Sequence, residues 1–381
     1  MTKEKRICVL TTVDLTLESF VIPAARFMKD SGWNVTLVSN MSESFLKKYS
    51  VEFRCISVPM ERGNSIKDLL IMPFFFRRFF VNEHYDIVQY ATPNASLYAS
   101  LGSKWAGVKK RVYCQWGIRY VGFTGMKRLL YKAIEKIICK CSTHIRPASW
   151  GNLSFAVSEG LYKRGIAAAI GDGGTIGVDL TQFDINLKQS NKDLVLRQYP
   201  QLENKMVFCF VGRLNRDKGI YELLEAFRRL SLEFENVSLL QIGDLEGVLP
   251  ANLEEIKKSS KVVLTGWTNE VAKYLSSSDV LVNPSYREGF SMVIQQAMAL
   301  AIPVVTTDIP GPSEVIEPNV SGILAKPRDV DSLYNCMKWM IEHPEERQVM
   351  GRAGRKRCEE RFNRWRMLQL TLEDRERILY E

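Results

Sequence analysis

The sequence lacks the cysteine and histidine patterns of disulfide-rich and metal-binding proteins. Its eight cysteines include no C-x-x-C pair, and only three histidines occur among 381 residues. Several cysteines have apolar neighbours, which favours small buried thiols over disulfides. Cys139 and Cys141 lie near His144, but their spacing is poor for a metal and a fourth ligand is missing. The sequence therefore predicts no disulfide framework and no metal site.

Long apolar runs are also missing. The longest, residues 69–76, has eight residues and contains Pro73, so no segment is expected to span a membrane. Lys3, Lys5 and Arg6 lead directly into an apolar strand, without the apolar core of a secretion signal. Both absences predict a cytoplasmic protein.

Charge is unevenly divided along the chain. Residues 1–180 contain 25 Lys and Arg against 14 Asp and Glu, a net charge of +11, whereas residues 181–381 carry −2. The chain is also too long for one ordinary core, which suggests two domains. We expect the basic half to face an anionic partner, either nucleic acid or a membrane surface. Because no nucleic-acid recognition motif accompanies the basic excess, the membrane is the preferred partner and no nucleic acid is expected.

Strands and helices are predicted to alternate through both halves of the chain. Crossovers of ten or more residues between strands imply parallel sheets with right-handed connections. The predicted fold class is therefore α/β, with two doubly wound Rossmann-like domains. The predicted strands are 7–12, 34–39, 52–58, 86–91 and 110–114, then 206–211, 237–242, 262–264, 280–282 and 303–306. The predicted helices are 17–29, 66–80, 94–106, 126–141 and 220–230.

The alternation pauses at residues 171–179, which read G-D-G-G-T-I-G-V-D. Their glycines do not have the spacing of a dinucleotide-binding loop, so a phosphate loop, an interdomain hinge and a plain turn all remain open. We place the boundary here, between a first domain of residues 1–180 and a second of 181–360. Residues 361–381 are predicted to form a separate C-terminal helix. Its expected apolar face is Phe362, Trp365, Leu368 and Leu372.

Residues 283–299 contain the first pattern typical of a binding site. An apolar strand, 280–282, ends there, and the chain crosses a short loop into a helix. The N-terminus of such a helix offers backbone N–H groups and a positive dipole end, which bind phosphate. Glu288 would accept hydrogen bonds from sugar hydroxyls, and Gly289 would let a bulky ligand approach the backbone. An ordinary strand–helix turn is the alternative interpretation.

Residues 210–220, F-V-G-R-L-N-R-D-K-G-I, contain the second pattern. Arg213 offers a planar fork of donors and Lys218 a mobile point charge, a combination suited to a diphosphate. A basic surface turn is the alternative interpretation.

The two patterns together resemble the family 4 glycosyltransferases, which are retaining enzymes of the GT-B fold. S-Y-R-E-G-F is similar to their donor-site motif, in which two glutamates separated by seven residues contact the donor sugar and the ribose. Glu288 matches the first glutamate, and Gln296 replaces the second. Glutamine can still bond ribose hydroxyls but loses the charge-assisted share, roughly half of each bond's strength. The resemblance implies two domains facing a central cleft, with the C-terminal helix crossing back to the first.

The resemblance also assigns roles to residues. G-R-L-x-x-x-K-G is similar to the family's phosphate loop, so Glu288, Arg213 and Lys218 are the candidate catalytic residues. L-T-G-W-T-N-E, residues 264–270, is similar to the loop beneath the nucleobase, although core packing is the alternative role for its tryptophan. The candidate donor-binding residues are Gly212, Arg213, Lys218, Gly266, Trp267, Glu288, Gly289, Phe290, Ser291 and Gln296.

The implied activity is transfer of a hexose or N-acetylhexosamine from a nucleotide-diphosphate sugar, with UDP-sugar preferred, to a lipid-linked glycan in surface polysaccharide biosynthesis. Retention needs no enzymic nucleophile, because the donor's β-phosphate accepts the acceptor proton. No D-x-D motif occurs, so no metal or other cofactor is expected. A sugar-nucleotide epimerase of the same fold and a non-catalytic nucleotide- or glycan-binding module remain the alternatives.

The acceptor side is expected in the first domain. The run Y-C-Q-W-G-I-R-Y places Trp116 where many relatives have a histidine, with Arg119 three residues later. Arg119 could serve an anionic acceptor or the leaving phosphate. Asp14 follows the first strand, and Asp14, Trp116 and Arg119 are the candidate acceptor-side residues. The aromatic segment 69–81 is interpreted either as a core helix or as a contact with the inner face of the plasma membrane.

Overall fold

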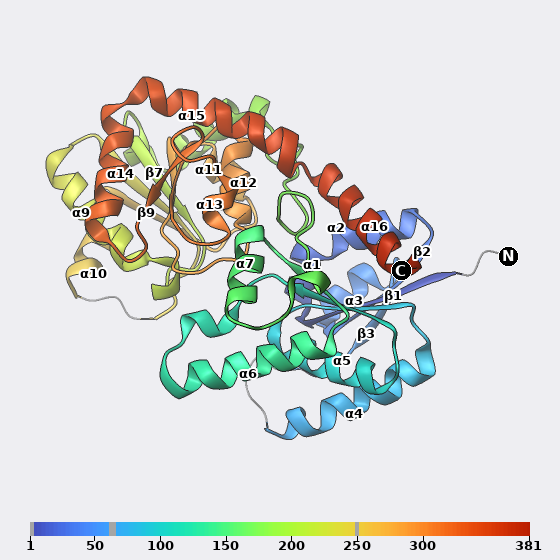
Figure 1. Ribbon diagram of the computed structural model, residues 1–381. Coiled ribbons are helices and arrows are strands. Elements are labelled where there is room, and N and C mark those ends of the chain that lie inside the picture. Colours follow the sequence, from blue (N-terminus) through green and yellow to red (C-terminus); the bar gives the residue numbers. More distant parts are fainter. Residues whose placement is uncertain (1–3, 61–65, 248–250) are drawn as a thin grey trace. The chain divides into compact units, whose positions relative to one another are not determined.

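The computed structural model describes residues 4–60, 66–247 and 251–381, which form two compact units (Figure 1). Unit 1 extends to Ile176 and also includes Trp365–Glu381, and unit 2 is Gly177–Arg364. The predicted boundaries, after residues 180 and 360, lie four residues from these two divisions. The last helix thus belongs to the first unit even though it follows the second in the chain.

Unit 1 is built on a six-stranded parallel sheet in the order β3-β2-β1-β4-β5-β6. Its strands are β1 (Lys5–Val13), β2 (Trp33–Asn40), β3 (Arg54–Ser57), β4 (Ile87–Tyr90), β5 (Lys110–Gln115) and β6 (His144–Pro147). Apolar runs such as Ile7–Leu10 are buried throughout, as expected for strands covered on both faces. The order reverses between β1 and β4, so the sheet is doubly wound.

Two helical layers cover this sheet (Figure 1). One layer packs on the core that contains Phe76, Tyr98 and Ile138, and it includes α4 (Ile66–Glu83), α5 (Pro93–Trp105), α6 (Gly125–Cys141) and α7 (Trp150–Ser158). The other packs on the core that contains Leu17 and Ile378, and it includes α1 (Asp14–Phe20), α2 (Ile22–Asp30), α3 (Glu43–Tyr49) and α16 (Arg364–Tyr380).

Helix α4 settles how the aromatic segment 69–81 divides its side chains. It is one continuous helix despite Pro73 in its interior. Phe76 and Phe80 are buried in the core, whereas Leu70 and Phe74 are exposed. The segment is therefore a core helix on one face and an apolar surface on the other. Within the described residues, no helix is long and apolar enough to cross a bilayer.

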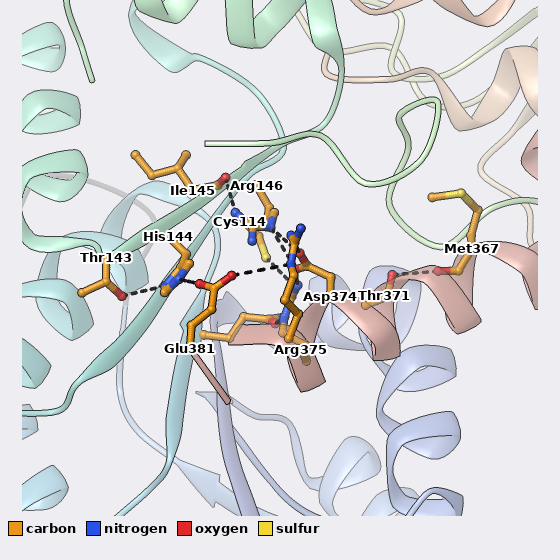
Figure 2. A network of polar contacts seen from close by, with 12 residues as sticks. Cys114, Thr143, His144, Ile145, Arg146, Met367, Thr371, Asp374, Arg375 and Glu381 are labelled. Carbon is orange, nitrogen blue, oxygen red and sulfur yellow. Dashed lines mark hydrogen bonds and ion pairs between the residues drawn. The ribbon is translucent and has the colours of Figure 1, made fainter. Parts of the chain in front are cut away.

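A buried polar network fixes α16 to the unit 1 sheet (Figure 2). Arg146 on β6 donates through Nε to both oxygens of Asp374, at 2.9 Å each. Arg375, only 1% exposed, pairs with the same carboxylate and donates through Nε to Gln89 Oε1 at 2.7 Å. At the end of the helix, His144 Nε2 lies 3.0 Å from a Glu381 carboxylate oxygen. The buried Asp374 carboxylate therefore forms ion pairs with two buried guanidinium groups.

Unit 2 repeats the architecture with a parallel sheet in the order β12-β11-β10-β7-β8-β9. Its strands are β7 (Met206–Val211), β8 (Val237–Ile242), β9 (Val262–Gly266), β10 (Val280–Asn283), β11 (Val304–Thr307) and β12 (Gly322–Ala325). Its helices are α8 (Lys188–Gln198), α9 (Ile220–Glu233), α10 (Ala251–Lys257), α11 (Val271–Leu275), α12 (Met292–Ala299), α13 (Pro312–Val315), α14 (Val330–Glu342) and α15 (Pro344–Arg357).

The α/β prediction is confirmed, but some elements differ from it. Strands β6 and β12 were not predicted; β6 reads H-I-R-P, with a charged residue and a proline, and β12 reads G-I-L-A, which begins at a glycine, so neither sequence favours a strand. The expected apolar face of the C-terminal helix is wrong in two positions. Trp365 is largely exposed, and Phe362 precedes the helix and packs edge-on against Phe290 of unit 2, with ring centroids 5.4 Å apart. The helical period alone does not show where a helix begins.

Replacing Asp374 with Asn should lower the free energy of unfolding of unit 1 by about 3–5 kcal/mol, because it leaves Arg146 and Arg375 buried without a counter-charge. Thermal unfolding followed by circular dichroism measures this change. Glu373→Gln, on the exposed face of the same helix, is the control and should leave the midpoint unchanged. Equal midpoints for the two variants would contradict the proposed role of the network.

The same network predicts a dependence of stability on pH. Burial alone would raise the pKa of the Asp374 carboxyl, but the charges of Arg375 and Arg146 lower it below its ordinary value of 3.8. Because the folded state has the lower pKa, this carboxylate stabilises unit 1 at neutral pH. The stabilisation is lost as the pH falls from about 4 through the lower folded-state pKa.

Candidate active site

The two sequence patterns of unit 2 meet at one edge of its sheet. β7 and β10 are neighbours, and the chain continues from β7 to one side of the sheet and from β10 to the other. This is the switch point at which open parallel sheets bind ligands, outside the carboxyl ends of the strands. The loops 212–219 and 284–291 follow these two strands. Patterns about seventy residues apart in the sequence thus form one site.

A close backbone contact holds the two loops together. Gly219 has φ +72°, and a Cβ atom there would lie 2.1 Å from the carbonyl oxygen of Pro284. Tyr286 N donates to Asp217 O at 2.9 Å, and Arg287 Nη2 lies 2.7 Å from Asp217 Oδ2. These contacts hold the two loops against each other, and only glycine fits at position 219.

The candidate catalytic pair lies at this junction. Lys218 Nζ and Glu288 Oε1 form an ion pair, and both side chains are half-buried. Ser285 Oγ also donates to Glu288 Oε1, at 3.3 Å. The ammonium and carboxylate groups are thus fixed side by side, one suited to phosphate oxygens and the other to sugar hydroxyls.

The loop after Glu288 is anchored before α12 begins. Phe290 and Ser291 are buried, and the hydroxyl of Ser291 accepts a hydrogen bond from Asn283 Nδ2 at 3.1 Å instead of capping the helix. Gly289 is also buried. These three candidate donor-binding residues therefore shape the loop. Any contact that they make with a ligand comes from their backbone groups.

Arg213 pairs with a different carboxylate from that of Lys218. Its Nη1 is 3.0 Å from Glu246 Oε2, and Asn215 Nδ2 donates to the same oxygen at 3.0 Å. Arg213 and Glu246 are both exposed, and such an ion pair contributes about 0–1 kcal/mol. A diphosphate can therefore displace the carboxylate at little cost. Sequence analysis missed Glu246, which lies in no recognised motif.

The loops after β8 and β9 extend the site along the same edge. Gly243 has φ +134°, and a Cβ atom there would lie 2.1 Å from Gly212 O. Gly243 N donates to Gly266 O at 2.9 Å, and Trp267 N donates to Asp244 Oδ1 at 3.0 Å. The indole of Trp267 is 70% exposed, which excludes the core-packing alternative for this tryptophan.

Gln296 lies on α12 and is half-buried. Among the residues that the structure describes, none forms a hydrogen bond with the side-chain amide of Gln296. The neighbouring Gln295 differs, because it is fully buried and its Nε2 donates to Ser291 O at 3.3 Å. Gln296 therefore has the accessible amide of the two.

Asp14 is engaged within unit 1. Its carboxylate accepts hydrogen bonds from Leu15 N at 2.7 Å, Ser42 N at 2.8 Å and Ser42 Oγ at 2.6 Å. Partial burial alone would raise its pKa, but the hydrogen bonds from Ser42 and Leu15 lower it. These contacts fix the turn before α3, so they give no support to the predicted role with an acceptor.

The other two acceptor-side candidates follow the carboxyl end of β5. Trp116 is half-buried, with its ring 5.6 Å from that of Phe20. The guanidinium carbon of Arg119 lies 4.5 Å from the centre of the Tyr131 ring. The structure therefore places both near one edge of the sheet but in different aromatic surroundings.

Metal-ligating side chains do not gather in the described parts of the chain: His, Cys, Asp and Glu residues form no group of three or more that is suited to a metal ion. Metal independence remains a prediction.

Two family models match the chain. The model described as "Glycosyl transferases group 1" matches residues 191–357, and the model described as "Glycosyl transferase 4-like" matches residues 6–147. The first match contains the site at the β7–β10 junction, and the second covers most of unit 1.

Curated relatives include a capsular polysaccharide glycosyltransferase and a galactosyltransferase. The capsular polysaccharide biosynthesis glycosyltransferase CapM of Staphylococcus aureus is 27% identical over 344 residues, which covers 88% of each chain. The UDP-Gal:alpha-D-GlcNAc-diphosphoundecaprenol alpha-1,3-galactosyltransferase of Escherichia coli is 26% identical over 264 residues, with 67% of this chain and 66% of that one covered.

Solved structures share the fold over nearly the whole chain. HepE from Anabaena in complex with UDP superimposes with a TM-score of 0.76 at 16% identity, covering 98% of this chain and 99% of that one. A glycosyltransferase from Rickettsia africae gives a TM-score of 0.79 at 18% identity and 99% coverage of both chains. Residues 6–147 and 191–357 both match glycosyltransferase family models and the solved structures share this fold, so the chain consists of a glycosyl transferase 4-like domain and a group 1 glycosyltransferase domain in the GT-B fold of two Rossmann-like domains.

Proposed function

We propose that this glycosyltransferase moves a hexose or N-acetylhexosamine from a UDP-sugar to a lipid-linked glycan, with retention of the anomeric configuration, in surface polysaccharide biosynthesis. The observation that carries the proposal is the Lys218–Glu288 pair at the switch point of unit 2. The names of CapM and of the Escherichia coli galactosyltransferase support the pathway and the lipid-diphosphate acceptor. The UDP complex of HepE supports the nucleotide.

In this proposal the donor lies along the edge formed by the four loops. Lys218 and Arg213 bind the diphosphate and exchange their present carboxylate partners for phosphate oxygens. Glu288 accepts hydrogen bonds from the sugar hydroxyls. Gly266 and Trp267 contact the base, since the Trp267 ring is exposed beside Asp244. The side-chain amide of Gln296 forms hydrogen bonds with the ribose hydroxyls.

The reaction then follows from charge stabilisation. The bond between the anomeric carbon and the β-phosphate oxygen breaks, and the acceptor oxygen bonds to the same face of the sugar. The acceptor proton passes to the departing β-phosphate, so no protein nucleophile is required. Lys218 and Arg213 stabilise the charge that develops on the diphosphate, which is electrostatic catalysis by fixed groups. These two cations substitute for a metal in our proposal.

The lipid-linked acceptor implies work at a membrane surface. We propose that the protein is cytoplasmic and binds the anionic inner face of the plasma membrane through α4. Leu70 and Phe74 are exposed there, with Arg77 beside them, and the Phe74 ring lies 5.2 Å from that of Trp105 at the end of α5. Apolar and basic side chains on one helix face are suited to a membrane interface.

Donor specificity is tested by nucleotide release from a panel of UDP- and GDP-sugars, with and without lipid-linked acceptor and in the presence of chelator. One UDP-sugar should show acceptor-dependent release that survives the chelator. Lys218→Ala and Glu288→Ala should each lower kcat by roughly 10²–10³-fold, because each removes a fixed group at the diphosphate or sugar. Lys258→Ala and Glu235→Ala, on exposed positions of unit 2, are the controls. Full activity in Lys218→Ala would contradict the proposed site.

Gln296→Glu tests the ribose contact. A carboxylate would make charge-assisted bonds to the ribose hydroxyls, a gain of about 1 kcal/mol, so the KM for the UDP-sugar should fall about fivefold. Gln201→Glu, on the exposed surface of unit 2, is the control for the added charge. An unchanged KM would show that position 296 does not contact the donor. If the unmodified protein and Gln296→Glu both bind the donor without turnover, the result would instead favour the non-catalytic binding module.

Membrane contact through α4 is tested by flotation with phosphatidylglycerol vesicles. Leu70→Ser combined with Phe74→Ser should weaken binding by at least about tenfold, because both exposed apolar side chains lose their transfer free energy. Leu232→Ser, an exposed leucine on α9 of unit 2, should bind as the unmodified protein does. Equal binding of all three proteins would show that the exposed face of α4 does not contact the membrane.

A further inference from the structure

Aromatic rings and basic side chains gather where α6 begins. The chain leaves β5, passes through the short helix Arg119–Gly122, and enters α6 at Gly125. The rings of Phe123 and Tyr131 stack with centroids 4.9 Å apart. Arg119 and Lys127 both lie on the Phe123 ring, with Lys127 Nζ 4.5 Å and the Arg119 guanidinium carbon 6.0 Å from its centroid. One aromatic platform thus holds two cations.

The charges on this patch do not balance. Glu159 is the carboxylate beside it, and its Oε2 lies 2.6 Å from Lys132 Nζ and 3.5 Å from Arg128 Nη2. In the chain as the structure describes it, neither Arg119 nor Lys127 has an ion-pair partner. The platform therefore leaves two positive charges that no carboxylate of the described residues pairs with.

Large exposed apolar side chains lie with Lys127 on the first turns of α6. Met126 is 81% exposed, Leu129 61% and Leu130 54%. Exposed apolar residues beside cations at one helix end are typical of a membrane interface, where the charged groups meet lipid headgroups and the apolar groups enter the acyl boundary. A soluble anion would account for the cations but not for these three side chains.

The position of the patch agrees with a lipid partner. α4, α5 and α6 pack in one layer on the same core and lie on the same side of the unit 1 sheet (Figure 1). The exposed face of α4 therefore belongs to the same layer as the α6 patch. The patch also lies just beyond the carboxyl end of β5, which is the edge that bears Trp116.

We propose that Arg119 and Lys127 bind the phosphate groups of membrane lipids, and above all the diphosphate of a lipid-linked acceptor, while Met126, Leu129 and Leu130 enter the bilayer interface. The choice of this lipid rests on the proposed function, because it requires a lipid-linked acceptor. The two cations would hold the diphosphate at the membrane surface, and so position the attached glycan at the edge of unit 1.

Flotation of the full chain tests this site without any need for turnover. The vesicles are phosphatidylcholine alone, phosphatidylcholine with phosphatidylglycerol, and phosphatidylcholine with a polyprenyl diphosphate. Binding should require one of the two anionic lipids and should be stronger with the diphosphate. Arg119→Gln combined with Lys127→Gln should weaken it roughly 25-fold, at about fivefold for each charge near an anionic surface.

Two further variants separate charge recognition from misfolding. Lys127→Gln alone removes an exposed ammonium and should weaken binding about fivefold without changing the thermal midpoint. Lys47→Gln combined with Arg352→Gln removes the same two charges from exposed positions on α3 and α15, and should bind like the unmodified protein. If this control weakens binding as much as the Arg119 and Lys127 pair, the effect is one of net charge and the site is wrong.

Two further outcomes would overturn the proposal. The first is unchanged binding by the Arg119 and Lys127 double variant. The second is complete release of the protein from diphosphate vesicles by soluble pyrophosphate at low concentration, which would indicate a free-phosphate site. In the transfer assay, the double variant should raise the KM for the lipid-linked acceptor and leave the KM for the UDP-sugar unchanged. If no transfer is found for the unmodified protein but flotation still depends on Arg119 and Lys127, the proposed function fails and the lipid-phosphate site stands.

Discussion

The site of unit 2 depends on a backbone contact that only glycine permits. Gly219 lies against the carbonyl of Pro284, and this contact joins the loop after β7 to the loop after β10. Lys218 and Glu288 lie on the two joined loops, so the backbone contact brings their side chains within reach of an ion pair. A preformed pair of opposite charges at the switch point of a parallel sheet is what a sugar diphosphate requires.

The two units share a strand order but differ in charge and in what they expose. Unit 2 concentrates its chemistry at the carboxyl edge of its sheet. Unit 1 carries the basic excess, and its α4 and α6 present apolar and cationic side chains together. The buried ion pairs of Asp374 with Arg146 and Arg375 stabilise the packing of α16 on the unit 1 sheet. In our proposal the donor thus belongs to unit 2, and the membrane and its lipid-linked acceptor to unit 1.

Much of this architecture could be predicted from the sequence, because apolar strands and amphipathic helices alternate with clear periods. The loops around Lys218 and Glu288 could be predicted too, since each follows a strand and contains conspicuous glycines and charges. Other features depend on tertiary contacts. β6 contains an arginine and a proline and β12 begins at a glycine, so only their pairing in the sheet identifies them as strands. The partner of Arg213 is a glutamate from another loop, and the hydrogen bonds to the Asp14 carboxylate come from a turn near Ser42.

The central claim is that Lys218 and Arg213 hold a diphosphate, and calorimetric titration of UDP against UMP tests it most directly. Each charge-assisted bond to the second phosphate is worth about 1.5–3 kcal/mol, so UDP should bind at least about tenfold more tightly than UMP. Lys218→Ala should remove most of this difference. Equal affinities for UDP and UMP in the unmodified protein would contradict the account.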